Sequence, residues 1–441
     1  MPDESWDKQE YYDYARSLFD PAGIPDKPEL LSGVTVLEVA VYMNGPLVGT
    51  YLAELGAEVI KFELPPGARD GIPDGGDLLR YTGPTGPDTK DASLYFLQHN
   101  HNKRYVTLDL ATPRGKKIFQ RMATHADTDV LVENMRAGAM DKLGVGYRQL
   151  SAEHPGLIYL ANNGPGQWGP LADMLTYDTS AQAMAGHIYQ TGFPEDDPQY
   201  PGIPTRIGSG LGDYCGAMWG YSAILAALLY RKETGKGQFI ECSQIEGMLR
   251  ILEQGIELYS TRGEIRERAG NRDAKNASIP AYTAPCKDGY VYVAAPQRQL
   301  ANLCAAMGRP ELVDDPRFSS EELKVENQDA LYAIIDAWLL GHTREELRRL
   351  ADEHSFIMAP VLNSKDICEL PHYRERGAIV EVDDPHYGKL KTAAMPTHFS
   401  ETPARIKHTG KPVGADNAYV YEKFLGYGRE ELEQLRAEKV I

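Results

Sequence analysis

The chain has 441 residues, of which 42% are hydrophobic and 25% charged, values typical of a globular protein rather than a disordered or fibrous one. Its formal net charge is −17 and no run rich in Lys or Arg offsets it, so the composition argues against nucleic acid as a partner. Five scattered cysteines, without CxxC or CxH spacing, fit a reducing compartment and argue against a disulfide framework or a metal site.

The N-terminal residues predict no signal peptide, because residues 1–10 are polar and acidic. The most apolar stretch, residues 217–230, is too short and too interrupted to span a bilayer. We therefore expect a cytoplasmic protein with no membrane partner. A chain of this length is expected to form two domains.

The first 30 or so residues are polar and aromatic with three prolines, and we expect an irregular arm there. A strand over 33–40, a helix over 45–56 and a strand over 57–63 then follow in close succession. Pro46 suits the first turn of that helix and Gly56 suits its C-terminal cap. Strand, helix and strand in about thirty residues form a βαβ unit, so the strands are expected to be parallel.

This alternation continues through the first half of the chain. Further strands are predicted over 104–110, 128–135, 156–163 and 237–243, and Thr112-Pro113 opens a helix that ends near residue 126. Repeated βα units predict a doubly wound, Rossmann-like parallel sheet. A helix over 211–231 is apolar on nearly every side, which favours burial between domains or subunits. A long amphipathic helix is predicted over 244–262.

The pattern changes after residue 262. A strand is predicted over 287–294, helices over 297–307, 327–340 and 343–354, a hairpin over 378–394, and a last helix in the tail. We expect three segments: a large Rossmann-like domain over 1–225, linker helices with a smaller α+β domain over 226–395, and a C-terminal return to the large domain over 396–441.

Common catalytic and nucleotide motifs are absent from the sequence. The first βα turn, VYMNGPLVG, lacks GxGxxG, and no P-loop, GxSxG or HExxH occurs. Two acidic features stand out. Asp178 opens a small apolar segment, as a helix N-cap or as a functional carboxylate, and Glu195 to Asp197 lie in a Gly/Pro-framed loop that by itself indicates only a solvated loop. Lys103-Arg104 is the best basic pair, as a phosphate contact or as an exposed surface pair.

Several sequence blocks together resemble class III CoA-transferases of the CaiB/BaiF type. They read GVTVLEVA, GPLVGTYLAELGAEVIKFELPPGARD, NKRYVTLDL, DVLVENMRAGAMDKLGVGY, LIYLANNGPGQWGP, YDTSAQAMAG and LLYRKETGKGQFIECSQIEGML, in family order and spacing. The resemblance runs from about Leu31 to the end of the chain. It implies a Rossmann-like large domain, a smaller domain, and two chains interlocked like rings: a homodimer, or a heteromer with a paralogue.

The resemblance also implies the chemistry. In this family a carboxylate attacks the acyl-CoA thioester, and the acyl group passes through an anhydride while an enzyme–CoA thioester forms. The family pattern Thr-Gly-x-Pro-Asp-Gly-Pro falls on residues 191–198. Gapless alignment selects Glu195 as nucleophile and one inserted residue selects Asp196; we favour Asp196 and keep Asp178 as a further candidate. Coenzyme A is the expected acyl carrier, with no metal.

Carried over residue by residue, the resemblance assigns coenzyme A contacts to Met43, near the thioester, and to Leu108, Asn134, Met135, Lys142 and Leu143. Arg69 and Arg104 are the candidates for positive charge near the phosphates. Leu64 stands where the family often has a basic residue, which departs from its adenine-side pattern. The segment 268–277 is more similar to carnitine- and bile-acid-type transferases and favours a bulky acceptor acid.

Two other functions remain open from the sequence. A related acyl-CoA racemase pairs an Asp at the position of Asp178 with a His, for which His154 is the candidate here. Alternatively, the chain is a non-catalytic CoA-binding subunit of a heteromeric transferase, since the acidic loop departs from the family pattern.

Overall fold

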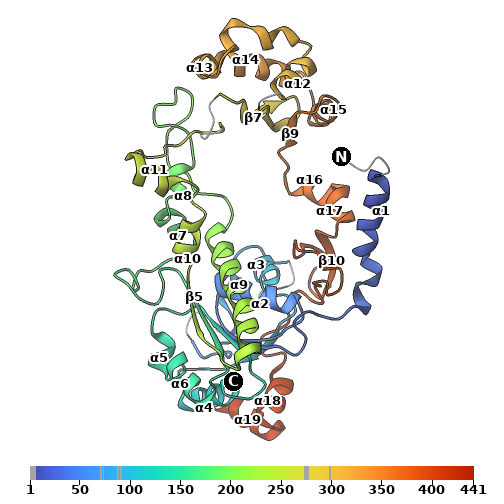
Figure 1. The fold of residues 1–441 in the computed structure, drawn as a ribbon. Helices are drawn as coiled ribbons and strands as arrows, with labels where there is room; N and C mark the ends of the chain where they lie inside the picture. Colours follow the sequence, from blue (N-terminus) through green and yellow to red (C-terminus); the bar gives the residue numbers. More distant parts are fainter. Residues whose placement is uncertain are drawn as a thin grey trace. The chain divides into compact units, whose positions relative to one another are not determined.

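The computed structural model describes residues 6–69, 72, 74–86, 89, 92–272, 278–296 and 299–441. The chain forms two compact units (Figure 1). Unit 1 comprises Met1–Ala185, Ser209–Ile251 and Pro371–Ile441, and unit 2 comprises Gly186–Gly208 and Leu252–Leu370. These boundaries differ from the domain boundaries expected after residues 225 and 395, and that partition into domains stays a prediction.

Unit 1 contains a six-stranded parallel sheet in the order β3-β2-β1-β4-β5-β6. Its strands are β1 (Thr35–Val39), β2 (Glu58–Glu63), β3 (Arg104–Thr107), β4 (Val130–Glu133), β5 (Ile158–Asn163) and β6 (Phe239–Ser243). This is the strand order of a Rossmann-like sheet, so the predicted α/β fold class is confirmed. The order reverses direction between β1 and β4, and open α/β sheets bind ligands at such a point, beyond the carboxyl ends of the strands.

Alternating side chains of the strands supply two cores, one on each face of the sheet. Val36 packs with the helices α2 (Asn44–Glu54) and α9 (Leu211–Thr234), which lie beside one another on one face (Figure 1). Leu37 packs on the other face with α4 (Pro113–Ala123) and with the C-terminal helices α18 (Asn417–Leu425) and α19 (Arg429–Ala437). The tail of the chain is therefore part of this core, through Val420, Tyr421, Phe424, Leu432 and Leu435.

Unit 1 also contains an antiparallel hairpin and several short helices. The hairpin pairs β10 (Ile379–Asp384) with β11 (Gly388–Ala393), where a His-Tyr-Gly turn was predicted. The short helices are α3 (Leu94–Gln98), α5 (Ala139–Leu143), α6 (Tyr147–Glu153), α7 (Asp178–Met184), α10 (Gln244–Arg250) and α17 (Pro371–Glu375).

Unit 2 packs helices against a small antiparallel sheet, in the order β7-β8-β9. The strands are β7 (Ala281–Cys286), β8 (Gly289–Ala294) and β9 (Ile357–Pro360); the helices are α8 (His187–Gln190), α11 (Gly255–Arg262), α12 (Gln299–Ala306), α13 (Glu321–Glu326), α14 (Gln328–Leu339), α15 (Arg344–His354) and α16 (Ser364–Glu369). Val291 and Val293 of β8 pack on Leu303, Ile335 and Leu347 in one core.

Two predicted elements differ from the structure. The N-terminal arm is not irregular: it contains the helix α1 (Lys8–Leu18), because Asp7 caps it by accepting from the backbone N–H groups of Gln9 and Glu10. The predicted helix over 244–262 is broken, because Glu253 and Gln254 adopt left-handed backbone conformations with φ of 41° and 51°, which an α-helix does not contain. Within the described ranges, no helix has the length and hydropathy needed to cross a membrane.

Candidate active site

The carboxyl ends of β1 and β4 are joined by a side chain at the point where the strand order reverses. Asn134 follows β4, and its Nδ2 donates to the Val41 carbonyl at 2.8 Å. The Val41 N–H donates back to Asn134 Oδ1 at 3.0 Å. This pair of bonds brings Asn134 and the turn that carries Met43, two of the expected coenzyme A contacts, to one edge of the sheet.

The first turns of α9 lie at the same edge. Asn162, near the carboxyl end of β5, donates to Asn44 Oδ1 at 3.0 Å and to the Gly216 carbonyl of α9 at 3.3 Å. A Cβ on Gly216 would lie 2.7 Å from Asn44 Oδ1, so only glycine lets α9 approach the start of α2 this closely. Asp213, in the first turn of α9, is thereby placed beside the β1–α2 turn.

The Asp213 carboxyl is held by one amide and lies next to a methionine. Gln244 follows β6, is 3% exposed, and donates from Nε2 to Asp213 Oδ1 at 2.7 Å. A Cβ built on Gly210 would lie 3.1 Å from the Met43 methyl carbon and 3.8 Å from Asp213 Oδ2, so both groups border the same glycine. Burial, and after it the negative charge of Asp178, raise the pKa of Asp213 to about 7, while the bond from Gln244 partly opposes this rise.

Asp178 serves a different purpose from the predicted N-cap. Tyr177 is the N-cap residue of α7 and Asp178 is the first residue of the helix. The Asp178 carboxyl accepts from the Gly212 N–H at 2.7 Å and from Gln182 Nε2 at 2.8 Å. It therefore anchors the start of α9, one residue before Asp213, and also holds Gln182 of its own helix.

Glu195 and Asp196 both have exposed side chains, in a loop of unit 2. Asp197 organises this loop by accepting from the backbone N–H groups of Gln199 and Tyr200 at 2.9 and 2.8 Å. Within the loop itself, neither Glu195 nor Asp196 is shielded from water, as an acyl anhydride requires. Which of the two is the nucleophile, if either, stays a prediction.

The remaining expected coenzyme A contacts fall into two groups. Leu108 is buried in the core and Met135 and Leu143 are partly buried against it, with the Met135 N–H donating to Glu133 Oε2 at 2.6 Å. Burial raises the pKa of Glu133 to about 8.

The cationic residues carry more exposed side chains. Lys142 and Arg69 are exposed. Arg104 is 37% exposed and already pairs with Asp416 at 3.2 Å, with its guanidinium over the Tyr419 ring at 4.6 Å. Its charge is therefore largely balanced by the C-terminal segment.

The racemase pair is not brought together. His154 Nε2 lies 2.8 Å from the carbonyl of Thr128, which precedes β4 at the amino edge of the sheet. Asp178 instead contacts Gly212 at the start of α9, at the carboxyl edge. A proton acceptor and donor for one α-carbon must face the same substrate atom, which these positions do not allow.

Sequence reasoning missed Asp213, although a signal was present. Between Leu211 and Arg231 it is the only acidic residue in a helix that is otherwise almost entirely small or apolar. Burying a lone acidic side chain near the start of such a helix is unfavourable because the charge loses its hydration. A residue kept there despite this desolvation penalty is a candidate for a functional role.

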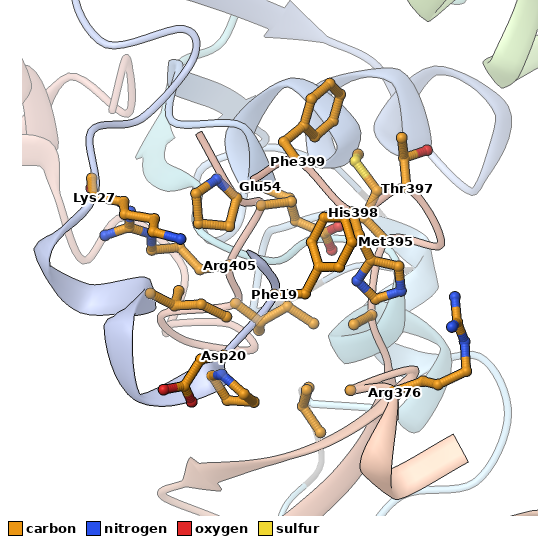
Figure 2. A pocket seen from close by; sticks show the side chains of 18 of the residues that line it. Phe19, Asp20, Lys27, Glu54, Arg376, Met395, Thr397, His398, Phe399 and Arg405 are labelled. Carbon is orange, nitrogen blue, oxygen red and sulfur yellow. The ribbon is translucent and has the colours of Figure 1, made fainter. Parts of the chain in front are cut away.

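A separate cavity of about 260 Å³ lies at the far end of α2 (Figure 2). Glu54, the last residue of α2, lines it, while Met43 precedes the first residue of the same helix. Eleven helical residues span roughly 16 Å, so this cavity is distinct from the region around Asp213. Its walls are mostly apolar and include Phe19, Met395 and Phe399, with Arg376 and His398 to one side.

No group of three or more His, Cys, Asp or Glu side chains among the described residues is arranged to hold a metal ion.

Comparison with known proteins agrees with this architecture. The family model described as CoA-transferase family III matches residues 31–417. The chain is 35% identical over 416 residues to the succinyl-CoA–D-citramalate CoA-transferase of Chloroflexus aurantiacus, covering 94% of this chain and 98% of that protein. It is 32% identical to the alpha subunit of succinyl-CoA–L-malate CoA-transferase from the same species, covering 93% and 92% of the two chains.

A crystal structure of a CaiB/BaiF family protein from Brucella suis superposes with a TM-score of 0.79 at 29% identity, over 90% of this chain and all of that one. These findings confirm the resemblance seen in the sequence and the CoA-transferase activity that it implied. The chain belongs to CoA-transferase family III.

Proposed function

We propose that this enzyme moves coenzyme A from succinyl-CoA or a similar short acyl-CoA to a small dicarboxylic acid, with the Asp213 carboxylate as the acyl acceptor. The substrate class rests on the two Chloroflexus relatives, whose names pair succinyl-CoA with citramalate and with malate. This proposal replaces the bulky acceptor inferred from residues 268–277, of which 273–277 lie outside the described residues.

The observation that carries the proposal is the placement of Asp213. Its carboxyl lies at the carboxyl edge of the sheet beside Met43, is oriented by Gln244, and sits in the first turn of a 24-residue helix. The N-terminus of a helix favours an anion, which opposes part of the rise in the pKa of Asp213 that burial causes. With a pKa of about 7, a large fraction of Asp213 is ionised at neutral pH and available as a nucleophile.

The proposed steps conserve every atom. The Asp213 carboxylate attacks the thioester carbonyl, a mixed anhydride forms, and the C–S bond breaks to release the coenzyme A thiolate. The thiolate attacks the Asp213 carbonyl carbon, and the donor acid leaves as a carboxylate. The acceptor carboxylate then attacks this enzyme thioester, and the released thiolate attacks the acceptor carbonyl of the second anhydride, which frees Asp213. Holding the reactants together lowers the barrier by about 7–11 kcal/mol in favourable cases.

Trapping with hydroxylamine tests the assignment. The enzyme is incubated with succinyl-CoA and hydroxylamine, digested, and searched by mass spectrometry for a hydroxamate on each acidic peptide. We expect the adduct on Asp213, and we expect Asp213→Asn to abolish both the adduct and CoA transfer. A double variant, Glu195→Gln with Asp196→Asn, is the matched control and should keep the adduct. An adduct on residue 195 or 196 would refute the assignment to Asp213.

We further propose that the active form is a dimer in the cytoplasm. The helix α9 exposes Trp219, Leu229 and Tyr230, which are 44%, 69% and 48% exposed in the single chain, and large apolar side chains exposed in this way favour a protein partner. Light scattering coupled to size exclusion should give twice the chain mass. A monomer that transfers CoA at full rate would refute the dimer, and a monomer that gains activity only with a paralogous chain would support the heteromer, as the name "alpha subunit" implies for the malate enzyme.

A further inference from the structure

Four charged side chains form a buried chain beneath the β1–α2 turn. Lys61 Nζ lies 2.9 Å from Asp77 Oδ2 and 3.1 Å from Glu38 Oε1, and Lys103 Nζ lies 2.9 Å from Glu38 Oε2. The side chains of Lys61, Glu38 and Lys103 are fully buried and that of Asp77 is 1% exposed. Positive and negative charges alternate, so this group is balanced.

The same charges hold three backbone groups of the turn over residues 40–46, here called the 40–46 turn. Lys61 Nζ donates to the Ala40 carbonyl at 2.7 Å, and Lys103 Nζ donates to the Pro46 carbonyl at 2.7 Å. The Tyr42 N–H donates to Asp77 Oδ1 at 3.2 Å. The start, the middle and the end of the turn are therefore each fixed by a buried charged group.

The middle of the turn has an unfavourable backbone conformation. Tyr42 has φ of 61°, in the left-handed region that costs a residue with a side chain about 1–2 kcal/mol. Such a conformation persists where its surroundings impose it, and here the bond from the Tyr42 N–H to Asp77 is part of what imposes it. The next residue is Met43, whose methyl group borders Gly210 together with Asp213.

Stability alone does not account for this arrangement. Replacing a buried ion pair by apolar residues of similar volume is often neutral or stabilising, so packing would be served as well by hydrophobic side chains. Apolar side chains, however, cannot form hydrogen bonds with the backbone groups of Ala40, Tyr42 and Pro46. The charges thus add control over the position of the turn.

We propose that Asp77, Lys61 and Lys103 are positioning residues for CoA transfer: through the 40–46 turn they set Met43 against Asp213. This inference rests on the proposed function of Asp213. A displacement of about 1 Å at a reacting centre lowers the rate by about a hundredfold, so loss of this control should appear in kcat rather than in folding.

Two double variants test the role of the Tyr42 bond at constant charge and nearly constant shape. Both carry Lys61→Met, and they differ in having Asp77→Asn or Asp77→Leu. The amide of the first can still accept from the Tyr42 N–H, whereas the second cannot. We expect the Leu double variant to have a kcat at least tenfold below that of the Asn double variant, with denaturation midpoints that agree closely. Equal kcat values would overturn the proposal.

One control separates the turn from the neighbouring 3₁₀ helix η2 (Leu78–Tyr81), because Asp77 also accepts from the Leu79 N–H at 2.9 Å. Ser93 Oγ donates to the Leu79 carbonyl at 2.5 Å and accepts from the Phe96 N–H at 3.1 Å as the N-cap of α3. Ser93→Ala therefore loosens η2 and the start of α3 while leaving the hydrogen bonds of Asp77, Lys61 and Lys103 to the 40–46 turn in place. We expect it to keep kcat within about twofold of wild type. An equal loss of kcat in Ser93→Ala would overturn the proposal.

Lys103→Met is the second variant, should the Leu double variant not fold. It removes the donor to the Pro46 carbonyl and leaves Glu38 paired with Lys61, and we expect kcat to fall at least tenfold. An unchanged kcat would contradict the proposal. The two proposals fail in different experiments. The absence of a hydroxamate on Asp213 in wild type would refute Asp213 as the nucleophile. The kcat ratios are measured on CoA transfer and therefore test the positioning role whichever carboxylate is the nucleophile.

Discussion

Replacing Asp213 by Asn should make the protein more stable at alkaline pH while abolishing transfer. Burial raises the pKa of Asp213 from 3.8 to about 7. Between these values the unfolded chain has lost its proton while the folded chain retains it, so folding stability falls as the pH rises and levels off above pH 7. Three pKa units correspond to at most about 4 kcal/mol, and partial exposure reduces this to about 2 kcal/mol.

The Asn side chain does not titrate and its oxygen can still accept from Gln244. The stability gained by Asp213→Asn should therefore be less than half as large at pH 5 as at pH 8, measured as the free energy of unfolding in urea. Asp196→Asn, at an exposed position, is the control and should show no such change. An Asn variant that is less stable than wild type at pH 8, or a difference that does not depend on pH, would refute the reasoning.

Three further predictions concern charges around the site. Asp178→Asn removes a negative charge that raises the pKa of Asp213, so the acid limb of the kcat/KM profile should move to lower pH by about half a unit; an unmoved limb would contradict this. Burial, against the attraction of Glu38, lowers the pKa of Lys103 to about 8, so transfer should decline above pH 8 in wild type, and Lys103→Met should lack that alkaline limb in the same rate measurement. Gly49→Ala should lower the free energy of unfolding by about 2–3 kcal/mol in urea denaturation, because its Cβ would lie 1.9 Å from Glu38 Oε2; a fully stable variant would show that the carboxylate can move aside.

Much of unit 1 could be predicted because its signals are local. The apolar runs that form β1 and β2, and the Thr112-Pro113 pair that opens α4, depend on residues adjacent in the chain. The break in the predicted helix over 244–262 could not be predicted this way. Its apolar periodicity continues across residues 253 and 254, where the backbone turns left-handed and the chain passes from unit 1 to unit 2.

The Lys103-Arg104 pair shows the limit for charged residues. Lys103 directly precedes β3 and Arg104 is its first residue, and successive residues of an extended chain point to opposite sides. Lys103 is fully buried against Glu38, whereas Arg104 remains partly exposed beside Asp416. The sequence contains both acids, but they lie 65 and 312 residues away from their partners.

The sequence by itself determined the family, the parallel sheet and the kind of chemistry, because these follow from ordered blocks and local periodicity. Only the tertiary structure decided which carboxyl lies beside Met43 at the carboxyl edge of the sheet. Asp213, Gln244, Met43 and Asp178 are far apart in the chain and meet because parallel strands end at a single edge of the sheet. Burial and pairing are properties of that meeting point, and no single segment of the chain contains them.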